Sequence, residues 1–237
     1  MDISIIIPAR IGSSRFPMKP LYKIKNVPMI IRTCNQCAKA FDRKKIFVAT
    51  DSKKIFLLCK NYDYKSIMIK DKCLTGTDRV ALASKKINSE YFINLQGDEP
   101  IFNPVDIKKF IKKINKKSEC VFLGATKIKN IKDFYNTNIP KLVINKKNEL
   151  IYASRSPIPF SKKLNNRIFR QVLIYGFTRK LLNKFFSKKK TLLEKLEDIE
   201  ILRFIEMGVK VKIIELSDKS KSVDVLSDVK KVIKFIK

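Results

Sequence analysis

The stretch ISIIIPARIGSSRFPMKPL, residues 3–21, decides the fold because a strand pattern passes directly into a basic loop. Three consecutive isoleucines, residues 5–7, are typical of a strand buried on both faces of a parallel sheet. Pro8 favours the end of that strand. Ligands of open parallel sheets bind beyond the carboxyl ends of the strands, so the following loop is a candidate site.

This loop combines groups suited to phosphate, namely Arg10, Gly12, Ser13, Ser14, Arg15 and Lys19. Glycine and serine let the backbone turn and offer N–H donors, while arginine and lysine supply fixed positive charge. A bound triphosphate needs both kinds of group. The loop does not contain the P-loop pattern GxxxxGK[ST]. Taken alone, it is equally compatible with an ordinary solvated basic loop.

Outward from this stretch, the first half of the chain alternates between two patterns. Short apolar runs rich in β-branched residues predict strands at residues 3–8, 45–50, 65–70, 91–96 and 119–126. Amphipathic stretches between them predict helices over residues 28–41, 52–59, 78–87 and 104–114. This alternation indicates an α/β protein with a Rossmann-like, mostly parallel sheet that carries helices on both faces.

The second half has a different texture. Residues 140–155 predict a hairpin that turns at residues 146–148, and another strand is expected over residues 170–177. Two helices (residues 179–186 and 192–207), a strand (residues 209–216) and a terminal helix complete the pattern. We expect one domain over residues 1–237 with a small β-rich insert over about residues 138–177.

The net charge of +30 raises the question of nucleic acid. Lysine supplies 42 of the 52 basic residues and is spread along the whole chain, which is typical of AT-rich codon drift. We therefore expect no nucleic-acid partner, although a basic nucleic-acid-binding module stays open as an alternative of another class. No apolar run approaches 18 residues and no signal peptide is recognised, so we expect a cytoplasmic protein without a membrane partner.

The chemistry available is limited by what the chain lacks. It contains no histidine, which excludes the Ser-His and Cys-His nucleophile pairs of most hydrolases. It contains five scattered cysteines, Cys34, Cys37, Cys59, Cys73 and Cys120. Core packing is the favoured role for these thiols, with a redox or zinc pair at Cys34 and Cys37 as the alternative.

Two further segments predict a nucleotide site. In QGDEP, residues 96–100, Asp98 follows a strand and a glycine, which suits a Mg²⁺ ligand. An ordinary turn explains the same letters equally well. In TGTDR, residues 75–79, Thr77 is expected to cap a helix that begins near Asp78. A helix N-terminus also offers N–H groups to a nucleotide.

Two acidic segments near the end of the chain are less specific. Asp224, in SVD, is isolated in a basic tail, and a capping role for Ser227 or Asp228 leaves Asp224 available as a metal ligand. In LEKLEDIEILR, residues 193–203, carboxylates and Arg203 recur at helical spacing, so pairs within one helix would account for most of these charges. This inventory suits nucleotidyl transfer, where positioning and charge neutralisation supply most of the catalysis.

Taken together, eight segments in one order resemble the CMP-Kdo synthetases, the 3-deoxy-manno-octulosonate cytidylyltransferases. The segments are IIPARIGSSRFPMKPL, FVATD, TGTDR, NLQGDEP, YASRSPIP, RQVLIYGF, LEKLEDIEILR and SVDV. The resemblance implies a GT-A-like nucleotidyltransferase fold, a homodimer built through the insert, and a role in lipopolysaccharide synthesis. It also implies that the anomeric hydroxyl of the acidic sugar Kdo attacks the α-phosphorus of CTP and releases pyrophosphate.

The resemblance also implies roles for individual residues. The nucleotide would lie against Pro8, Ala9, Arg10, Arg15, Lys19, Thr75, Gly76, Thr77 and Arg79. Asp98 and Asp224 would bind Mg²⁺ and, with Lys19, form the catalytic set. The sugar would lie against Gln96, Arg155, Gln171, Tyr175 and Glu200.

Three positions depart from the family pattern. Met18 stands where the family has glycine, Gln171 where it has histidine and Ile201 where it has glutamine. Gln171 still donates hydrogen bonds but carries no charge. Because two of these positions are on the sugar side, a related acid such as 8-amino-Kdo or a nonulosonate stays open as the acceptor. Transfer to a phosphorylated acceptor is a further alternative.

Overall fold

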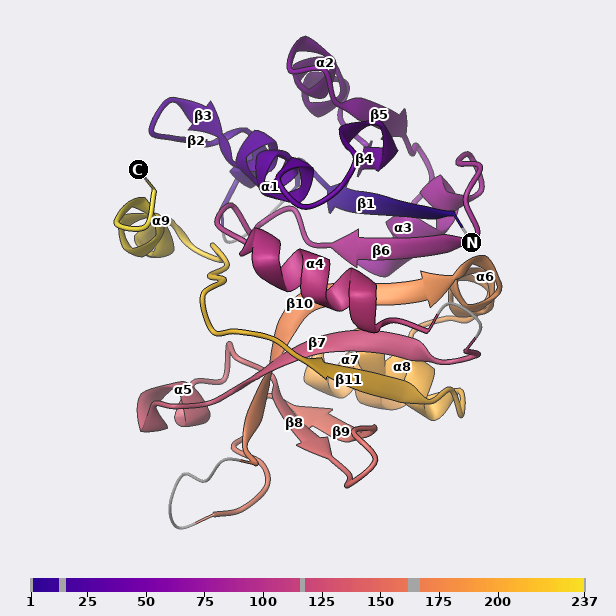
Figure 1. The fold of residues 1–237 in the computed structure, drawn as a ribbon, viewed down its shortest axis with the longest axis vertical. Coiled ribbons are helices and arrows are strands. Elements are labelled where there is room, and N and C mark those ends of the chain that lie inside the picture. Colours follow the sequence, from indigo (N-terminus) through magenta and orange to yellow (C-terminus); the bar gives the residue numbers. More distant parts are fainter. Residues whose placement is uncertain (1, 13–15, 116–117, 162–166, 237) are drawn as a thin grey trace.

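The computed structural model describes residues 2–12, 16–115, 118–161 and 167–236, and the buried isoleucine strand is an interior strand of its sheet (Figure 1). The strands follow the order β11-β7-β10-β6-β1-β4-β5. Their bounds are β1 Ile3–Ala9, β4 Ile46–Thr50, β5 Lys65–Met68, β6 Tyr91–Leu95, β7 Val121–Lys127, β10 Phe169–Thr178 and β11 Val211–Glu215. Strand β1 pairs in parallel with both β4 and β6, as the alternating pattern predicts.

Strand β10 makes the sheet mixed. It runs antiparallel to both of its neighbours, β6 and β7, while β7 and β11 pair in parallel. The beginning of β10 also pairs with β8 (Lys141–Ile144), which forms a hairpin with β9 (Leu150–Ser154) around the expected turn. The predicted α/β class with a mostly parallel sheet is confirmed, and β10 connects the hairpin to the main sheet.

Helices cover both faces of the sheet, and the isoleucines of β1 divide between the two resulting cores (Figure 1). Ile5 and Ile7 pack under α1 and α4, whereas Ile6 packs on the opposite side with α3, α6 and α8. The helices are α1 Met29–Ala38, α2 Lys53–Asn61, α3 Gly76–Ser84, α4 Pro104–Lys113, α5 Ile131–Tyr135, α6 Arg179–Phe186, α7 Leu192–Glu197, α8 Ile201–Glu206 and α9 Leu226–Ile233. Within the described ranges, no helix is long and apolar enough to cross a bilayer.

Short elements complete the chain. Strands β2 (Lys23–Ile24) and β3 (Val27–Pro28) form a separate small hairpin, and 3₁₀ turns lie at Lys19–Leu21 and Arg43–Lys45. Side chains at the expected boundaries cap several helices, including Ser52, Asn103 and Thr178. Each accepts a hydrogen bond from a backbone N–H group that has no partner within its helix.

The predicted helix over residues 192–207 is wrong, because the chain breaks it into α7 and α8. Asp198 adopts the left-handed conformation, with φ +50°, directly after α7. The expected pairs within one helix are wrong as well. Glu194 and Glu197 instead bond to distant partners, Arg203 and Ser154. Carboxylates at helical spacing here serve tertiary contacts, which spacing alone does not distinguish.

The capping prediction at Thr77 is also wrong by two residues. Thr75 is the N-cap of α3, and its hydroxyl accepts from the N–H of Asp78 while the Asp78 carboxylate accepts from the N–H of Thr75. This reciprocal arrangement satisfies two backbone donors at once. Asp228 does accept at the start of α9, from the N–H groups of Asp224 and Val225, as the expected capping role requires.

Met18 generates a prediction about stability. It adopts φ +54°, a conformation that costs a residue with a side chain about 1–2 kcal/mol, and its side chain is 45% exposed. We expect Met18→Gly to raise the free energy of unfolding by about 0.5–1 kcal/mol, the larger entropy of unfolded glycine offsetting part of the gain. Urea denaturation of both proteins measures this.

Met18→Ala is the matched control, because alanine removes the same side chain and keeps the unfavourable φ. If the glycine variant is no more stable than the alanine variant, backbone strain at this position is not the cause.

Candidate active site

The candidate site is organised around the ammonium group of Lys19. Its Nζ donates to Oδ2 of Asp98 at 2.8 Å and to the carbonyl of Val223 at 2.9 Å, and it lies 4.0 Å from Oδ1 of Asp224. The N–H of Val223 donates in turn to the carbonyl of Asp98. Three segments far apart in the sequence therefore meet where β1 and β6 end, as the strand-end argument predicts.

Asp98 and Asp224 fit a divalent cation in their donor chemistry. Oδ1 of Asp98 is buried and has no hydrogen-bond partner within the described part of the chain, while the Asp224 side chain is 38% exposed. Hard cations such as Mg²⁺ take carboxylate oxygens and keep several waters, so two carboxylates are enough. Across the described part of the chain, no cluster of three or more Asp, Glu, Cys or His side chains offers a fuller metal cage.

Glu99 is a buried neighbour that the sequence pattern does not single out. It is 4% exposed, and its Oε2 has no hydrogen-bond partner among the described residues. Burial, with the adjacent Asp98 carboxylate as a second cause, raises the pKa of Glu99 to about 8. In the sequence this glutamate precedes Pro100 and resembles a turn residue, so its burial could not be predicted.

The turn at Thr75–Thr77 packs tightly against the end of the central strands. A Cβ atom at Gly76 would lie 2.9 Å from Nε2 of Gln96 and 3.4 Å from Cγ of Pro8. A residue with a Cβ here would require the Gln96 side chain to shift, so glycine suits this close approach. The turn therefore brings the N-terminus of α3 beside Pro8, which is the arrangement that the two predicted nucleotide segments need.

The predicted arginines differ in how they are placed. Arg10 is exposed beyond β1, whereas Arg15 lies outside the described residues. Arg79 is 6% exposed, and its guanidinium donates to Oδ2 of Asp51 at 2.8 Å. The other oxygen of Asp51 accepts from the N–H of Ile11 at 3.4 Å, so Arg79 acts on the loop after β1 through Asp51.

Four of the predicted sugar-side residues form one chain of contacts. Nε2 of Gln171 donates to the Tyr175 hydroxyl at 2.6 Å, and burial together with the Glu200 carboxylate raises the Tyr175 pKa. Oε1 of Glu200 accepts from Nε2 of Gln96 at 3.2 Å. Oε2 of Glu200 accepts from the N–H of Thr77 at 3.1 Å, so one carboxylate contacts both the sugar side and the nucleotide side.

Arg155 is held by backbone carbonyl groups. It donates to the carbonyls of Thr137, Glu197 and Asp198 at 3.2, 2.7 and 3.1 Å. The left-handed turn at Asp198 presents two of these carbonyls, so the break between α7 and α8 positions this arginine. Ile201, at the third departure from the family pattern, is the first residue of α8 and is buried in the core.

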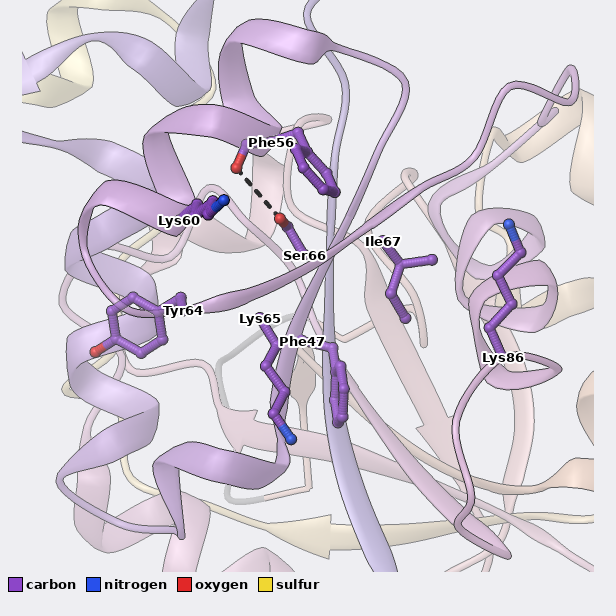
Figure 2. Close-up of a pocket in the computed structure, with 8 residues that line it drawn as sticks. All are labelled: Phe47, Phe56, Lys60, Tyr64, Lys65, Ser66, Ile67 and Lys86. Carbon is purple, nitrogen blue, oxygen red and sulfur yellow. Dashed lines mark hydrogen bonds between the residues drawn. The ribbon is translucent and has the colours of Figure 1, made fainter.

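Two hollows in the described part of the surface lie away from these residues. One of about 330 Å³ opens at the sheet edge beside β5, and its lining includes Phe47, Lys60, Lys65 and Lys86 (Figure 2). Another of about 390 Å³ lies between α4, β7, β11 and the turn of the β8–β9 hairpin. None of the predicted site residues lines either hollow.

The cysteines take the packing role predicted for them. Cys34, Cys37, Cys59 and Cys120 are buried without disulfides, while Cys73 is half-buried. Burial raises the pKa of Cys59 to about 12, which keeps this thiol protonated and unreactive.

Comparison with known proteins identifies the family of the chain. A family model described as "Cytidylyltransferase" matches residues 4–213. The 3-deoxy-manno-octulosonate cytidylyltransferase of Thermodesulfovibrio yellowstonii is 35% identical, over 88% of each chain. The enzyme of the same name from Geotalea uraniireducens is 34% identical over the whole of both chains.

Solved structures give the same result. The structure of CMP:2-keto-3-deoxy-manno-octonic acid synthetase complexed with CTP superposes with a TM-score of 0.92. It is 28% identical and covers 100% of this chain and 98% of that one. A putative glucose-1-phosphate thymidylyltransferase from Bacillus anthracis, 14% identical with a TM-score of 0.72, shares the fold over 98% of this chain and 94% of that one. The chain belongs to the cytidylyltransferase family and, within it, to the CMP-Kdo synthetases.

Proposed function

We infer that this chain transfers a cytidylyl group from CTP to 3-deoxy-manno-octulosonate, which provides an activated sugar for lipopolysaccharide synthesis. The observation that carries this inference is the meeting of Lys19, Asp98 and Asp224 at the end of the central strands. Relatives with this activity match over the full length of the chain. The reaction forms a bond between the anomeric oxygen and the α-phosphorus, breaks the α–β phosphoanhydride and releases the hydroxyl proton with pyrophosphate.

On the nucleotide side, we propose that Pro8, Ala9 and Arg10 contact cytidine. Thr75, Gly76 and Thr77 would lie beside the nucleotide at the N-terminus of α3, where backbone N–H groups favour anions. Arg79 would shape this pocket through Asp51. Arg15 and Lys19 would hold the β- and γ-phosphates as fixed cations.

In this proposal, the Lys19 ammonium binds carboxylates in the free protein and phosphate oxygens when CTP is bound. Its ammonium now lies beside two carboxylates that would otherwise repel each other. Bound CTP offers phosphate oxygens to the same ammonium, which frees the carboxylates for another cation. Asp98 and Asp224 would hold Mg²⁺, whose chemistry when bound is to neutralise phosphate charge and lower the pKa of the attacking hydroxyl. The buried Oδ1 of Asp98, which no described residue hydrogen-bonds, supports this role.

On the sugar side, we propose that Gln96, Gln171, Tyr175 and Glu200 bind the acceptor, with Arg155 supplying positive charge. The hydrogen bonds that join the first four orient each polar group before the sugar arrives. Gln171 offers an amide where the family has an imidazole, so this contact keeps the same charge at every pH.

We also propose that the chain works in the cytoplasm as a homodimer, as one domain whose β-rich insert forms the contact. Exposed apolar side chains on the insert, Ile151 at 54% and Phe160 at 89%, support this surface. Analytical ultracentrifugation of the wild-type protein should give twice the chain mass of 27.5 kDa. The Ile151→Glu variant should give a mass closer to that of a single chain. Leu57→Glu, on α2, is the matched control, and a wild-type monomer would contradict the proposal.

A pyrophosphate-release assay tests the activity. We expect release that requires CTP, Mg²⁺ and 3-deoxy-manno-octulosonate together. A panel with 8-amino-Kdo, neuraminate, pseudaminate and a sugar phosphate completes the experiment. Release with a different acid and none with 3-deoxy-manno-octulosonate would overturn the acceptor, while release with the sugar phosphate would indicate another class of acceptor.

The two aspartates provide a second test. We expect Asp98→Asn and Asp224→Asn each to lower kcat by about 100-fold or more, because each removes a carboxylate that supports several kcal/mol of transition-state stabilisation. Asp218→Asn is the matched control, since its partner Lys221 is a neighbour on the same loop. A kcat within a few-fold of wild type in both variants contradicts the metal assignment.

A further inference from the structure

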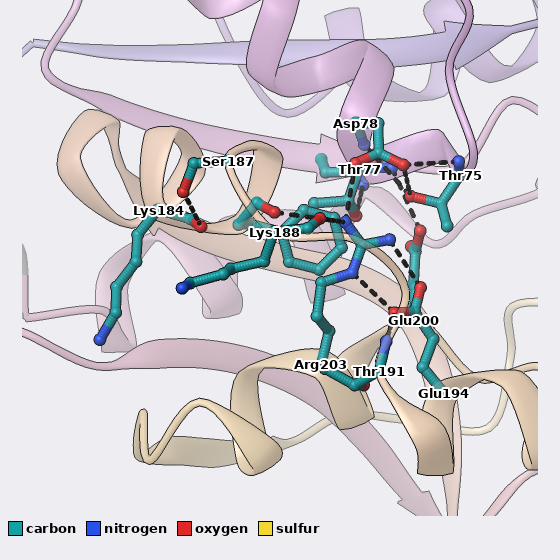
Figure 3. A network of polar contacts seen from close by, with 12 residues as sticks. Thr75, Thr77, Asp78, Lys184, Ser187, Lys188, Thr191, Glu194, Glu200 and Arg203 are labelled. Atoms are coloured by element: carbon teal, nitrogen blue, oxygen red, sulfur yellow. Dashed lines mark hydrogen bonds and ion pairs between the residues drawn. The ribbon is translucent and has the colours of Figure 1, made fainter.

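Arg203 is fully buried although it carries a charge, and it is not among the predicted site residues. It lies in α8, and its guanidinium binds Glu194 with two hydrogen bonds, of 2.6 and 2.7 Å (Figure 3). Nη1 also donates to the carbonyls of Phe185 and Lys188, both at 3.2 Å. The guanidinium stacks over the Phe185 ring, 3.7 Å from its centroid. So many fixed contacts leave this group little freedom to move.

One contact of Arg203 reaches the nucleotide side. Nη1 donates to Oδ1 of Asp78 at 2.9 Å, across 125 residues of sequence (Figure 3). The other oxygen of Asp78 accepts from the N–H and the hydroxyl of Thr75, at 2.7 and 2.9 Å. Asp78 therefore connects Arg203 directly to the turn that begins α3.

The same turn is held from its other side. Gly76 packs so closely against Gln96 and Pro8 that a Cβ there would require the Gln96 amide to shift. The N–H of Thr77 donates to Glu200, which lies three residues before Arg203. The turn is thus fixed between the ends of the central strands and the segment that carries Glu200 and Arg203.

Charge and the number of N–H donors together explain why residue 203 is an arginine. Arg203 is paired with two buried carboxylates, those of Asp78 and Glu194, which are 4% and 1% exposed. Arginine presents five N–H donors in a rigid plane, whereas a lysine ammonium presents a single point charge with three. A lysine at this site cannot bind both carboxylates and two carbonyls at once.

We propose that Arg203 is a positioning residue for CTP. Through Asp78, it fixes the Thr75–Thr77 turn so that the backbone N–H groups and the Thr75 hydroxyl are ordered before the nucleotide binds. This inference rests on the proposed function in one respect, the place of that turn beside the nucleotide. What is new is the reason that the turn is fixed, namely the contact of Arg203 with Asp78.

Arg179, in α6, offers a matched control because it contacts the opposite end of α3. Its guanidinium donates to the carbonyls of Ser84, Ile87 and Ser89, which end α3 and the turn after it. It also stacks over Phe92, 5.1 Å from the ring centroid. Both arginines stabilise α3, but Arg203 alone of the two contacts the turn at its N-terminus.

The experiment compares Arg203→Lys, Asp78→Asn and Arg179→Lys. CTP affinity is measured by calorimetry without sugar, at a temperature where each variant is folded, alongside the KM for CTP and for 3-deoxy-manno-octulosonate. Arg203→Lys and Asp78→Asn should each weaken CTP binding about 10-fold or more, the fold-change of losing a hydrogen bond to a charged group. The KM for the sugar should change less than the KM for CTP.

Arg179→Lys should lower the unfolding temperature and leave CTP affinity unchanged. Asp78→Asn keeps the Arg203–Glu194 pair intact, so this variant still tests the proposal if the Arg203 variant does not fold. Unchanged CTP affinity in a folded Arg203→Lys or Asp78→Asn protein overturns the proposal, as does equal weakening by Arg179→Lys. Wild-type protein that binds CTP but does not use the sugar would overturn the proposed acceptor alone.

Discussion

One ammonium group, that of Lys19, joins the parts of the chain on which the site depends. It links the loop after β1, the end of β6 and the segment before α9 through Asp98, Val223 and Asp224. The contact is partly shielded from water, since the Lys19 side chain is 15% exposed, so its charge is screened less than that of a surface pair. Without this ammonium group, the carboxylates of Asp98 and Asp224 beyond the ends of β1 and β6 would repel each other.

Much of this arrangement is predictable from local pattern. The apolar runs predict the strands, and the parallel sheet brings the ends of β1 and β6 to one edge, which places Pro8 near Gln96 and Lys19 near Asp98. Asp224 is identified by its isolation in a basic tail and by the resemblance, and the tertiary contact then brings it to Lys19. Local pattern thus predicts the sheet edge, and long-range contact completes the site.

The rest depends on contacts that spacing cannot reveal. The left-handed residue Asp198 breaks a continuous helical pattern, and Glu194 then bonds to an arginine nine residues away across that break. Asp78 looks like a first-turn helix residue, yet its partner is 125 residues later in the chain. Glu99 is buried although its sequence, directly before Pro100, is typical of a turn. In each case tertiary packing adds a contact or a burial that the local pattern does not show, as is common at functional sites.

The account depends on a cation and a triphosphate sharing the edge where Lys19, Asp98 and Asp224 meet. Crystals grown with CTP and Mn²⁺, with data collected at the manganese absorption edge, test this most directly. We expect an anomalous peak at roughly 2 Å from oxygens of both Asp98 and Asp224, with the triphosphate beside Lys19 and the Thr75–Thr77 turn. A peak that contacts neither aspartate, with CTP bound elsewhere, would contradict it.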